Sequence, residues 1–414
     1  MSKRELHLGV VGLGGRGCGL LKDIMCGREG IHIEAVCDPY PDRVQAAAEA
    51  VKERNGNLPA GFADYRELLL QDNIDTVIVT AAWEAHIEVA IAAMRAGKAV
   101  ACEVGGAYSL DSCWQLVHTQ EETGMPCMLL ENCCFDRNEL MVLNMVKQGV
   151  LGSVVHCRGG YQHDLRSEVA YGREIRHYRL RNYMNRHCEN YPTHELGPIA
   201  KILNINRGNR MVSLTSTASC ARGLNDFLQR EKGDGYDISN YPFTQGDVVT
   251  TVIRCAHGET IVLTLDTTLP RFYSRGFEIH GTRGMYTEDS RSIFLDGVHN
   301  KHDFDWMTMW NNVEKYREQY EHPIWRKFLN DGVRGGHGGI DTLEFDAFFT
   351  ALQEGYPVPI DVYDMASWMS ISTLSEQSIA MGGAPVAIPD FTNGRWTYRE
   401  EEPDWHFCLS KVCE

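Results

Sequence analysis

The 414-residue sequence predicts an α/β protein: an N-terminal, doubly wound parallel sheet followed by a C-terminal α+β domain with an open, mostly antiparallel sheet. Three observations predict this fold class. Strand-like and helix-like runs alternate through the first third of the chain, a glycine-rich turn directly follows the first strand, and strand patterns dominate after Gly152. We expect the two domains to span residues 1–132 and 133–414.

The N-terminal strands are predicted from short apolar runs, each followed by a run with helical spacing. The expected strands are Leu6–Val11, His32–Cys37, Thr76–Thr80, Ala99–Cys102 and Cys127–Leu130. The expected helices are Arg16–Cys26, Pro41–Glu53, Ala85–Ala96, Leu110–Glu122 and Arg137–Gln148. Because the carboxyl ends of parallel strands meet at one edge of the sheet, the loops there should form a ligand crevice.

The C-terminal domain shows alternating strand patterns with helices between and after them. The expected strands are Val154–Tyr161, Met211–Thr217, Val248–Cys255, Thr260–Thr267 and Phe277–His280. The expected helices are His194–Leu203, Glu314–Phe328, Asp341–Gln353 and Ala366–Met381. Residues 221–246 are polar and predict a long loop, and the rest of the stretch from Asp289 to His337 predicts irregular structure.

The glycine-rich turn, Gly12–Gly17, has the spacing of a dinucleotide-binding fingerprint within a strand–turn–helix context. Gly12 permits the tight turn, Gly14 allows a pyrophosphate to approach the backbone, and Gly17 lets helix and strand pack closely. Gly15 and Arg16 open the helix whose N–H groups would point at the phosphates. The alternative interpretation is a tight turn that needs glycine only for its dihedral angles.

An acidic residue, Asp38, stands at the tip of the second predicted strand. A carboxylate there accepts hydrogen bonds from the adenosine ribose and repels a 2′-phosphate. The sequence therefore predicts a Rossmann domain that binds NAD rather than NADP.

Charge and cysteine usage restrict the partners and the compartment. The 40 basic and 56 acidic residues give a net charge of −16, which disfavours nucleic acid and anionic membranes. No apolar signal or membrane-spanning segment is evident, and Met1–Glu5 lead directly into the first strand. Several cysteines lie in apolar runs, among them Cys37, Cys102, Cys127 and Cys255. We expect reduced thiols, no metal site and a cytoplasmic location.

The chain resembles the oxidoreductase superfamily of glucose-fructose oxidoreductase and inositol dehydrogenase, with one departure. In that superfamily the fourth of these strands ends in Glu-Lys-Pro, and the lysine assists hydride transfer. Here the tip is Glu103-Val104-Gly105. The missing lysine disfavours an ordinary dehydrogenase.

Longer motifs resemble glycoside hydrolase family 109, the NAD-dependent α-N-acetylgalactosaminidases. They are Trp83–His86, Glu103-Val104, Met128–Asn132, Cys157–Arg166, Tyr191–Pro198 and Asn204–Gly208, with a weaker late match at His337-Gly338-Gly339. The family commonly has glycine after the motif histidine, where this chain has Glu195.

The resemblance implies roles for individual positions. The positions implied to contact the cofactor are Trp83, His86, Glu103, Val104 and Asn132. The positions implied to contact the substrate are Tyr161, Arg179, Tyr191, His194 and Tyr273. We add Glu131 to the cofactor set as a proton-relay candidate, and His163 to the substrate set.

The mechanism we expect is hydrolysis without net redox change, because NAD-dependent glycosidases are an exception to the two-carboxylate rule. NAD oxidises sugar carbon 3, the ketone acidifies the hydrogen on carbon 2, the aglycone leaves by elimination, water adds, and the ketone is reduced again. His194 is the candidate base for the carbon 3 hydroxyl, since imidazole exchanges protons near neutrality. Tyr161 is the candidate for carbon 2, and we expect His163, Arg166 and the nicotinamide cation to lower its pKa. The reverse division of roles stays open.

Two other functions remain open at this stage. One is an NAD-dependent sugar or cyclitol dehydrogenase, which Val104 disfavours, and the other is a non-catalytic NAD-binding sensor, which His194 and Tyr161 disfavour. The expected substrate is a small-molecule glycoside or a glycan terminus. The expected assembly is a homo-oligomer, either a dimer or a tetramer.

Overall fold

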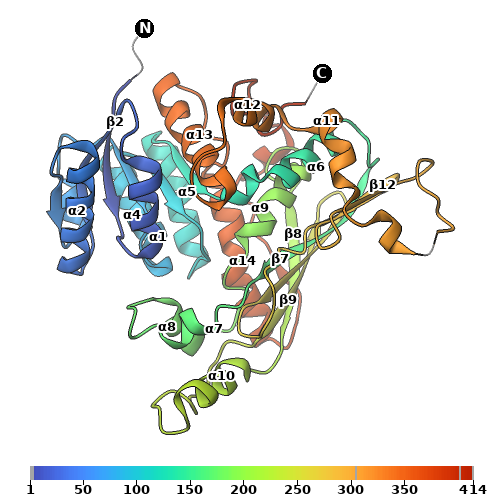
Figure 1. The fold of residues 1–414 in the computed structure, drawn as a ribbon, viewed down its shortest axis with the longest axis horizontal. Helices are drawn as coiled ribbons and strands as arrows, with labels where there is room; N and C mark the ends of the chain where they lie inside the picture. Colours follow the sequence, from blue (N-terminus) through green and yellow to red (C-terminus); the bar gives the residue numbers. More distant parts are fainter. Residues whose placement is uncertain (1–3, 304, 401, 413–414) are drawn as a thin grey trace. The chain divides into compact units, whose positions relative to one another are not determined.

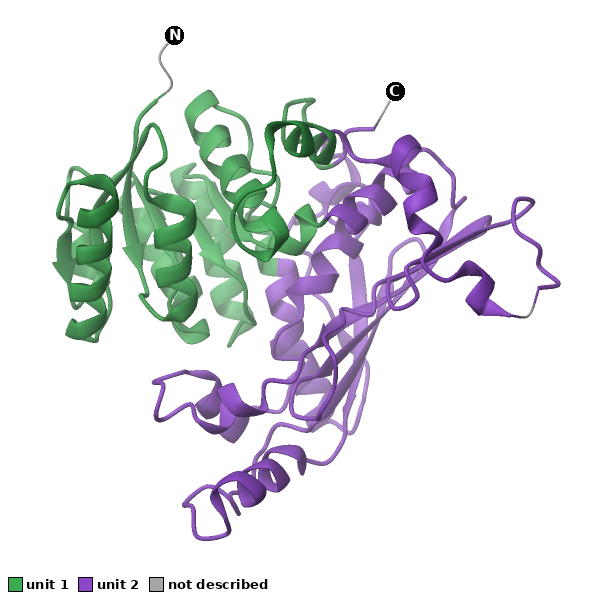
Figure 2. Ribbon diagram, viewed as in Figure 1, with its two compact units in different colours: residues 1–136, 324–366, 402–409 green, residues 137–323, 367–401, 410–414 purple. Residues whose placement is uncertain are grey.

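The computed structural model describes residues 4–303, 305–400 and 402–412 of the chain. By internal contacts the chain forms two compact units, coloured separately in Figure 2. The first unit contains residues 1–136, 324–366 and 402–409, and the second contains residues 137–323, 367–401 and 410–414. Residues 1–3, part of the segment Met1–Glu5 that was expected to run directly into the first strand, lie outside the described residues. The domain limits 1–132 and 133–414 stay a prediction.

The first unit contains a six-stranded parallel sheet in the order β3-β2-β1-β4-β5-β6 (Figure 1). Its strands are β1 Leu6–Val11, β2 Ile31–Cys37, β3 Ala60–Phe62, β4 Thr76–Val79, β5 Ala99–Glu103 and β6 Cys127–Leu130. The strand order reverses between β1 and β4, which is the topological switch point of a doubly wound sheet. The predicted fold class of this part is confirmed, and the short edge strand β3 is an addition.

The helices of this sheet follow the expected rhythm. They are α1 Gly15–Leu20, the π-helix η1 Leu21–Met25, α2 Pro41–Asn55, α3 Tyr65–Leu69, α4 Trp83–Arg95, α5 Leu110–Thr123 and the 3₁₀ turn η2 Asn132–Phe135. Local chemistry sets their ends: Ser109 caps α5 by accepting from the Ser112 amide, and Gly124, with φ +67°, ends it.

A late part of the chain returns to the first unit. It contains most of α12 (Pro323–Asp331), the turn η5 (His337–Gly339) and α13 (Ile340–Glu354). The buried side chains of α13 include Leu343, Phe345 and Phe348, and α13 packs against η2, β6 and η1. Burial of several large side chains of this kind is the main stabilising contribution to such packing. The α/β unit is therefore completed by residues from the far end of the chain.

The second unit contains an eight-stranded sheet in the order β13-β12-β11-β7-β10-β9-β8-β14. Its strands are β7 Val154–Gln162, β8 Met211–Ala218, β9 Val248–Cys255, β10 Thr260–Asp266, β11 Glu278–Gly281, β12 Gly284–Thr287, β13 Ser292–Leu295 and β14 Val386–Ala387. Only the β7–β10 pair is parallel among the strand pairs of this sheet in the described residues. The open, mostly antiparallel sheet is confirmed.

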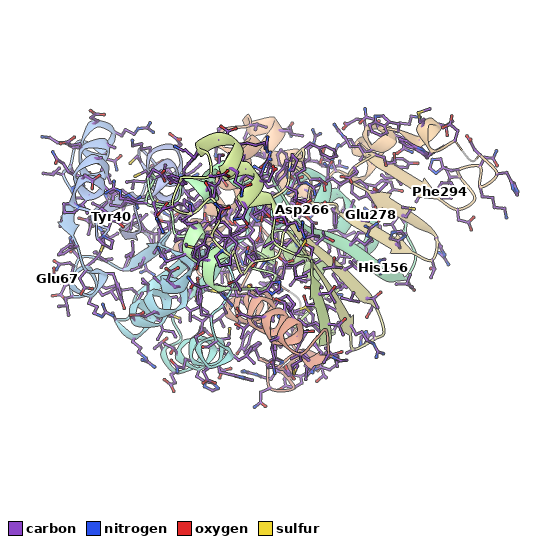
Figure 3. All side chains as sticks on the ribbon, turned by 90° about the horizontal axis from the view of Figure 1, so that it is seen from below. Tyr40, Glu67, His156, Asp266, Glu278 and Phe294 are labelled. Carbon is purple, nitrogen blue, oxygen red and sulfur yellow. The ribbon has the colours of Figure 1, made fainter. Side chains whose placement is uncertain are left out.

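The two faces of this sheet differ in burial. On β10, Ile261, Leu263 and Leu265 are fully buried, whereas the residues between them are half-buried. Figure 3 labels His156, Asp266 and Glu278, which belong to the half-buried face of β7, β10 and β11. The buried face carries α9 (Thr193–Ile202), which packs against β7.

The other helical segments of the second unit lie before, between and after these strands. They are α6 Arg137–Lys147, α7 Arg166–Ala170, α8 Arg179–Asn185, α10 Gly223–Lys232, η3 Trp306–Met309, η4 Asn312–Tyr316, α11 Arg317–Tyr320 and η6 Arg395–Thr397. Helix α14, Val362–Ala380, begins in the first unit and ends in the second.

Three expectations for the second part of the chain were wrong. The helix expected over Glu314–Phe328 is divided into η4, α11 and α12, because Pro323 has no N–H donor and forces the preceding residues out of the helical region. The expected loop 221–246 contains α10, whose Leu224 and Leu228 are buried. The expected irregular stretch after Asp289 contains β13.

Two further observations concern the helices and the cysteines. The described residues hold no helix with the length and apolarity needed to cross a membrane. Cys37, Cys102, Cys127 and Cys255 are free, buried thiols, and burial raises the pKa of Cys37, Cys127 and Cys255 to about 12. Such thiols are inert packing groups rather than nucleophiles.

Candidate active site

The glycine-rich turn is tightly packed on its inner side and open on the other. Gly12 has φ +100°, and a Cβ there would collide with the backbone of Ala81. A Cβ on Gly17 would collide with the carbonyl of Gly12, whereas one on Gly14 would have Arg43 at 3.8 Å as its nearest neighbour. Gly15 has no heavy atom within 4 Å of the position of a Cβ. This combination fits a dinucleotide pyrophosphate, which needs a tight turn and an unobstructed backbone.

Asp38 lies where the ribose of the cofactor is expected. Its carboxylate accepts hydrogen bonds from the amides of Leu13 (2.8 Å) and Tyr40 (3.0 Å), and the Arg43 guanidinium lies at 3.7 Å. These contacts fix a negatively charged group at the carboxyl end of β2, directly beside the glycine turn. The geometry supports the predicted preference for NAD, because the carboxylate would repel a 2′-phosphate.

The carboxyl end of β4 leads to two of the expected cofactor residues on α4. Trp83 is buried at the start of α4, and its ring lies so close to Gly105 that a Cβ there would approach within 2.6 Å. The buried His86 lies with Nε2 2.9 Å from the carbonyl of Ala81, and burial lowers its pKa. His86 is therefore a neutral imidazole that donates to the backbone, and it braces the loop after β4.

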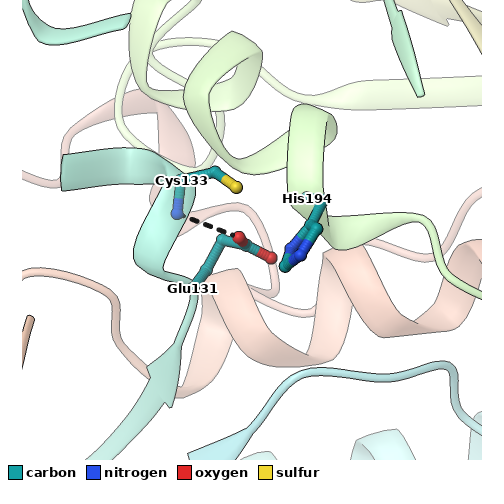
Figure 4. A group of neighbouring side chains, drawn as sticks. All are labelled: Glu131, Cys133 and His194. Atoms are coloured by element: carbon teal, nitrogen blue, oxygen red, sulfur yellow. Dashed lines mark hydrogen bonds between the residues drawn. The ribbon is translucent and has the colours of Figure 1, made fainter. Parts of the chain in front are cut away.

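The ends of β5 and β6 carry Glu103, Val104, Glu131 and Asn132. Glu103 accepts from the Val104 amide (3.2 Å) and from Nε of Arg16 (2.7 Å). Glu131 is fully buried and accepts from the Cys133 amide at 3.2 Å, as drawn in Figure 4. The structure thus brings the predicted cofactor residues of β1, β5 and β6 to one edge of one sheet.

The sequence analysis missed an acidic residue at this edge, Asp341 in the first turn of α13. Its carboxylate accepts from both terminal nitrogens of Arg16 (2.9 and 3.0 Å), from Asn132 Nδ2 (2.8 Å) and from His337 Nδ1 (2.7 Å). Arg16 was expected to open the helix whose N–H groups point at the phosphates; its guanidinium contacts Asp341 and Glu103. The weak His337-Gly338-Gly339 match was the sequence signal that pointed to this segment.

A cluster of aromatic and histidine rings lies within the second unit. The ring of Tyr161, on the helix-covered face of β7, lies 4.5 Å from that of Tyr191, 5.2 Å from His194 and 6.4 Å from Tyr273. His194 lies in the first turn of α9 and its ring is 4.8 Å from that of Tyr191. The structure therefore brings together, within the second unit, the substrate residues expected from separate motifs.

Arg179, the first residue of α8, belongs to the same cluster. Its guanidinium lies 5.2 Å above the Tyr191 ring and 5.9 Å from that of Tyr161, and it pairs with Glu168 at 2.9 Å. A buried guanidinium beside a phenol favours the phenolate form of that phenol. This position can therefore help Tyr161 to act as a base.

Tyr161 has a direct polar neighbour in His163. The Tyr161 hydroxyl lies 2.9 Å from Nδ1 of His163. Burial lowers the pKa of His163, and the Arg179 charge lowers it further. A neutral imidazole can accept the phenolic proton, so the pair can exchange it. Asp164 is not part of this exchange, because Arg166 holds its carboxylate through two hydrogen bonds of 2.9 and 2.7 Å.

Glu195, next to the motif histidine, has a structural explanation. Its side chain is fully buried, passes over Gly159 so closely that a Cβ there would collide with it, and lies 3.7 Å from Arg275. Arg275 also pairs with Glu139 at 2.6 Å. A buried ion network on the core side of the sheet is a packing feature, so Glu195 has a structural role.

Comparisons with known proteins match the part of the chain with the parallel sheet and the part with the mostly antiparallel sheet to two different family models. Residues 6–130 match the model of the oxidoreductase family with an NAD-binding Rossmann fold. Residues 135–398 match the model of the glycosyl hydrolase 109 C-terminal domain.

Whole-length relatives agree with these matches. A glycosyl hydrolase family 109 protein of Stenotrophomonas maltophilia is 38% identical over 96% of this chain and 91% of its own. An alpha-N-acetylgalactosaminidase of Tannerella forsythia is 36% identical over 95% of this chain and 88% of its own.

Solved structures share the fold at low identity. Levoglucosan dehydrogenase in complex with NADH and L-sorbose gives a TM-score of 0.66 at 18% identity, covering 94% of this chain and 100% of its own. The scyllo-inositol dehydrogenase of Lactobacillus casei with bound NAD(H) and scyllo-inositol gives 0.64 at 14% identity, covering 93% and 99%. This likeness concerns the fold alone.

Proposed function

Because the chain belongs to glycosyl hydrolase family 109 and carries an NAD-binding Rossmann domain, it is an NAD-dependent glycoside hydrolase, and we propose that it releases terminal α-linked N-acetylgalactosamine. The proposed specificity follows its relative from Tannerella forsythia, named as an alpha-N-acetylgalactosaminidase. The observation that carries the proposed mechanism is the Tyr161–His194 pair, two proton-transfer groups with rings 5.2 Å apart.

The first chemical step removes a hydride and a proton from carbon 3 of the sugar. When bound, NAD supplies the acceptor that takes this hydride and later returns it. We assign the proton of the carbon 3 hydroxyl to His194, because imidazole accepts and releases a proton near neutral pH. The resulting ketone makes the neighbouring hydrogen on carbon 2 acidic.

The second step removes the carbon 2 proton, and we assign it to Tyr161. Its phenolic proton passes to Nδ1 of His163, 2.9 Å away, and the Arg179 guanidinium stabilises the phenolate. The C–H electron pair forms a double bond between carbons 1 and 2, and the aglycone leaves carbon 1 with its bonding pair. Addition of water and the same transfers in reverse give the free sugar.

Three further residues of the cluster bind and orient the sugar in this proposal. The planar donors of Arg179 suit a sugar hydroxyl or carbonyl oxygen. Tyr191 supplies a buried ring, and Tyr273, which is 50% exposed, supplies a ring accessible to an incoming substrate. These contacts would fix the sugar with carbons 2 and 3 toward the two bases.

A dehydrogenase is the second candidate, since the structures of similar fold are dehydrogenases acting on polyols and sugars. Against it, the tip of β5 carries the buried, apolar Val104 and no lysine that could exchange a proton with an alcohol. A sensor without activity has no use for a paired tyrosine and histidine.

The deciding experiment is turnover of para-nitrophenyl α-N-acetylgalactosaminide in heavy water. The proposal expects release of nitrophenol, deuterium at carbon 2 of the product and no accumulation of NADH. Stoichiometric NADH without nitrophenol would establish the dehydrogenase instead. No reaction with a broad panel of α- and β-glycosides would favour the sensor.

Location and assembly are part of the same proposal. Buried free thiols such as Cys102 and Cys127 support a reducing compartment, and we propose the cytoplasm. The half-buried sheet face, with Val252 exposed on β9, supports a homo-oligomer that is a dimer or a tetramer. Light scattering that gives only the monomer mass would exclude the oligomer.

A further inference from the structure

A buried carboxylate from the far end of the chain forms the centre of the polar network at the cofactor edge of the first unit. Asp341 is 3% exposed and accepts four hydrogen bonds, two from Arg16 and one each from Asn132 and His337. Burying such a carboxylate without partners is strongly unfavourable. The four donors compensate this cost, and they tie three segments of the chain to one residue.

The segment before Asp341 has the backbone needed to place it there. His337, Gly338 and Gly339 have φ values of +49°, +68° and +101°, and a Cβ on Gly335 would collide with Thr342. Only glycine adopts such angles without strain, and His337 adopts one despite the cost. The turn brings Nδ1 of His337 onto Asp341, and this hydrogen bond raises the pKa of His337.

The network uses three N–H groups of Arg16, one from each of its nitrogens. Both terminal nitrogens meet Asp341, and Nε meets Glu103 at 2.7 Å. A bidentate carboxylate contact fixes the guanidinium plane as well as its position. Arg16 therefore joins the glycine turn to the end of β5 and holds the Glu103 carboxylate in one orientation.

The network also fixes the amide of Asn132. Because Nδ2 donates to Asp341 at 2.8 Å, a flipped amide would place its oxygen against a carboxylate. The Asn132 oxygen is thus turned away from Asp341. It accepts a weak hydrogen bond from the Cys133 thiol at 3.5 Å and keeps a second lone pair for another donor.

The position of these groups in the sheet identifies the part of the cofactor concerned. Asp38, directly after β2, marks the adenosine side of the switch point between β1 and β4. Glu103 ends β5 and Asn132 follows β6, on the opposite side of that point. A dinucleotide that crosses the switch point places its nicotinamide half over these strands.

We propose that Asp341 is a positioning residue of the NAD site, which presets Glu103 and the Asn132 amide oxygen for the nicotinamide nucleoside. Asp341 itself does not touch the cofactor in this proposal, and Arg16 acts through the same network rather than on a phosphate. The inference rests on NAD binding alone and is independent of the sugar and of the order of proton transfers.

The test compares Asp341→Asn with wild type by fluorescence titration of the full-length protein with NAD⁺ and with NADH. The variant keeps the shape of the side chain but removes its charge and part of its hydrogen bonding. We expect NAD⁺ to bind about tenfold more weakly and NADH about threefold more weakly, since the lost carboxylate also attracted the cationic ring. This difference between the two redox forms distinguishes a positioning role from general loss of stability.

The matched control is Asp346→Asn on the same helix, where the carboxylate pairs with Arg28 and Arg334 away from Arg16. It should bind both forms as wild type does. Wild-type affinities in Asp341→Asn, or equal losses for both forms with the same losses in the control, would overturn the proposal. If Asp341→Asn fails to fold, Arg16→Lys, which keeps both charges but cannot make the bidentate contact, must weaken NAD⁺ and NADH binding to a similar degree, and unchanged binding would be decisive against the proposal.

Discussion

Replacing Tyr161 by phenylalanine tests the proposed chemistry most directly. The substitution removes one oxygen and keeps the ring that lies 4.5 Å from Tyr191 and 5.2 Å from His194. Since no packing atom is lost, the variant should fold. The measured change then reports the hydroxyl and its 2.9 Å contact with His163.

The expected effects of Tyr161→Phe on folding stability and on reaction rate differ in size. Loss of one hydrogen bond costs about 1 kcal/mol of folding free energy, which in a chain of this length lowers the melting temperature by about 2 °C or less. Loss of a general base lowers the rate by roughly 10²–10⁴-fold, equivalent to about 3–5 kcal/mol in activation free energy. The rate effect should therefore exceed the stability effect several times over.

The assay follows nitrophenol release from the α-N-acetylgalactosaminide and, separately, deuterium at carbon 2 of the product. Both should fall together in Tyr161→Phe, because the same proton transfer limits them. NAD affinity should stay at the wild-type value, since Tyr161 is assigned to the sugar and not to the cofactor. The control is Tyr286→Phe on β12, which removes the same atom from another buried tyrosine of that unit.

Full turnover in Tyr161→Phe with normal carbon 2 exchange would refute the reasoning and remove this phenol from the mechanism. An equal loss in Tyr286→Phe would assign the effect to packing. Loss of nitrophenol release with unchanged carbon 2 exchange would move the phenol to the later, aglycone-releasing step.

Three more outcomes follow from the same structure. Because the Arg179 charge lowers the pKa of His163, Arg179→Gln should move the acidic limb of the kcat/KM profile to higher pH, and an unmoved limb would contradict the pairing. Burial raises the pKa of Glu189 from about 4.5 to about 8, so its contribution to stability is complete below about pH 4.5 and is lost progressively until the pH passes about 8. Glu189→Gln should therefore flatten the fall in melting temperature between about pH 5 and 8. Gly159→Ala should lower the free energy of unfolding in urea by about 1–3 kcal/mol, because the new Cβ would collide with the Glu195 side chain. The double variant with Glu195→Gly should regain most of that free energy; if the neighbours relax instead, the second substitution will regain little.

The strands could be predicted from the sequence where burial imposes a simple pattern. Leu6–Val11 and Cys127–Leu130 are short apolar runs buried on both faces, and Val248–Cys255 alternates between faces, so all three were predicted with their observed ends. Helix α10 was not predicted, because its two buried leucines stand among polar and charged residues that make the segment resemble a loop. The helix over Glu314–Phe328 failed because its apolar spacing outweighed the proline that breaks it.

The residues of the candidate site were also predicted only in part. Motifs placed Tyr161, Tyr191 and His194 near one another, and the fold brings their rings within 4.5–5.2 Å. Asp341 was beyond prediction, because an acid in the first turn of a helix is ordinary in itself. Its meaning depends on Arg16, which is more than 300 residues away in the sequence and next to it in space.

The discontinuity of the first unit also constrains the order in which the protein matures on the ribosome. The six strands are complete by Asp136, but Asp341 emerges about 200 residues later, on the order of 10–40 s at ~5–20 residues per second. During that interval the nascent sheet exposes the surface that α13 later covers. The cofactor site is therefore complete only after residue 341 has been synthesised. A protein truncated before that residue would carry every glycine of the fingerprint but would lack Asp341, which organises the site.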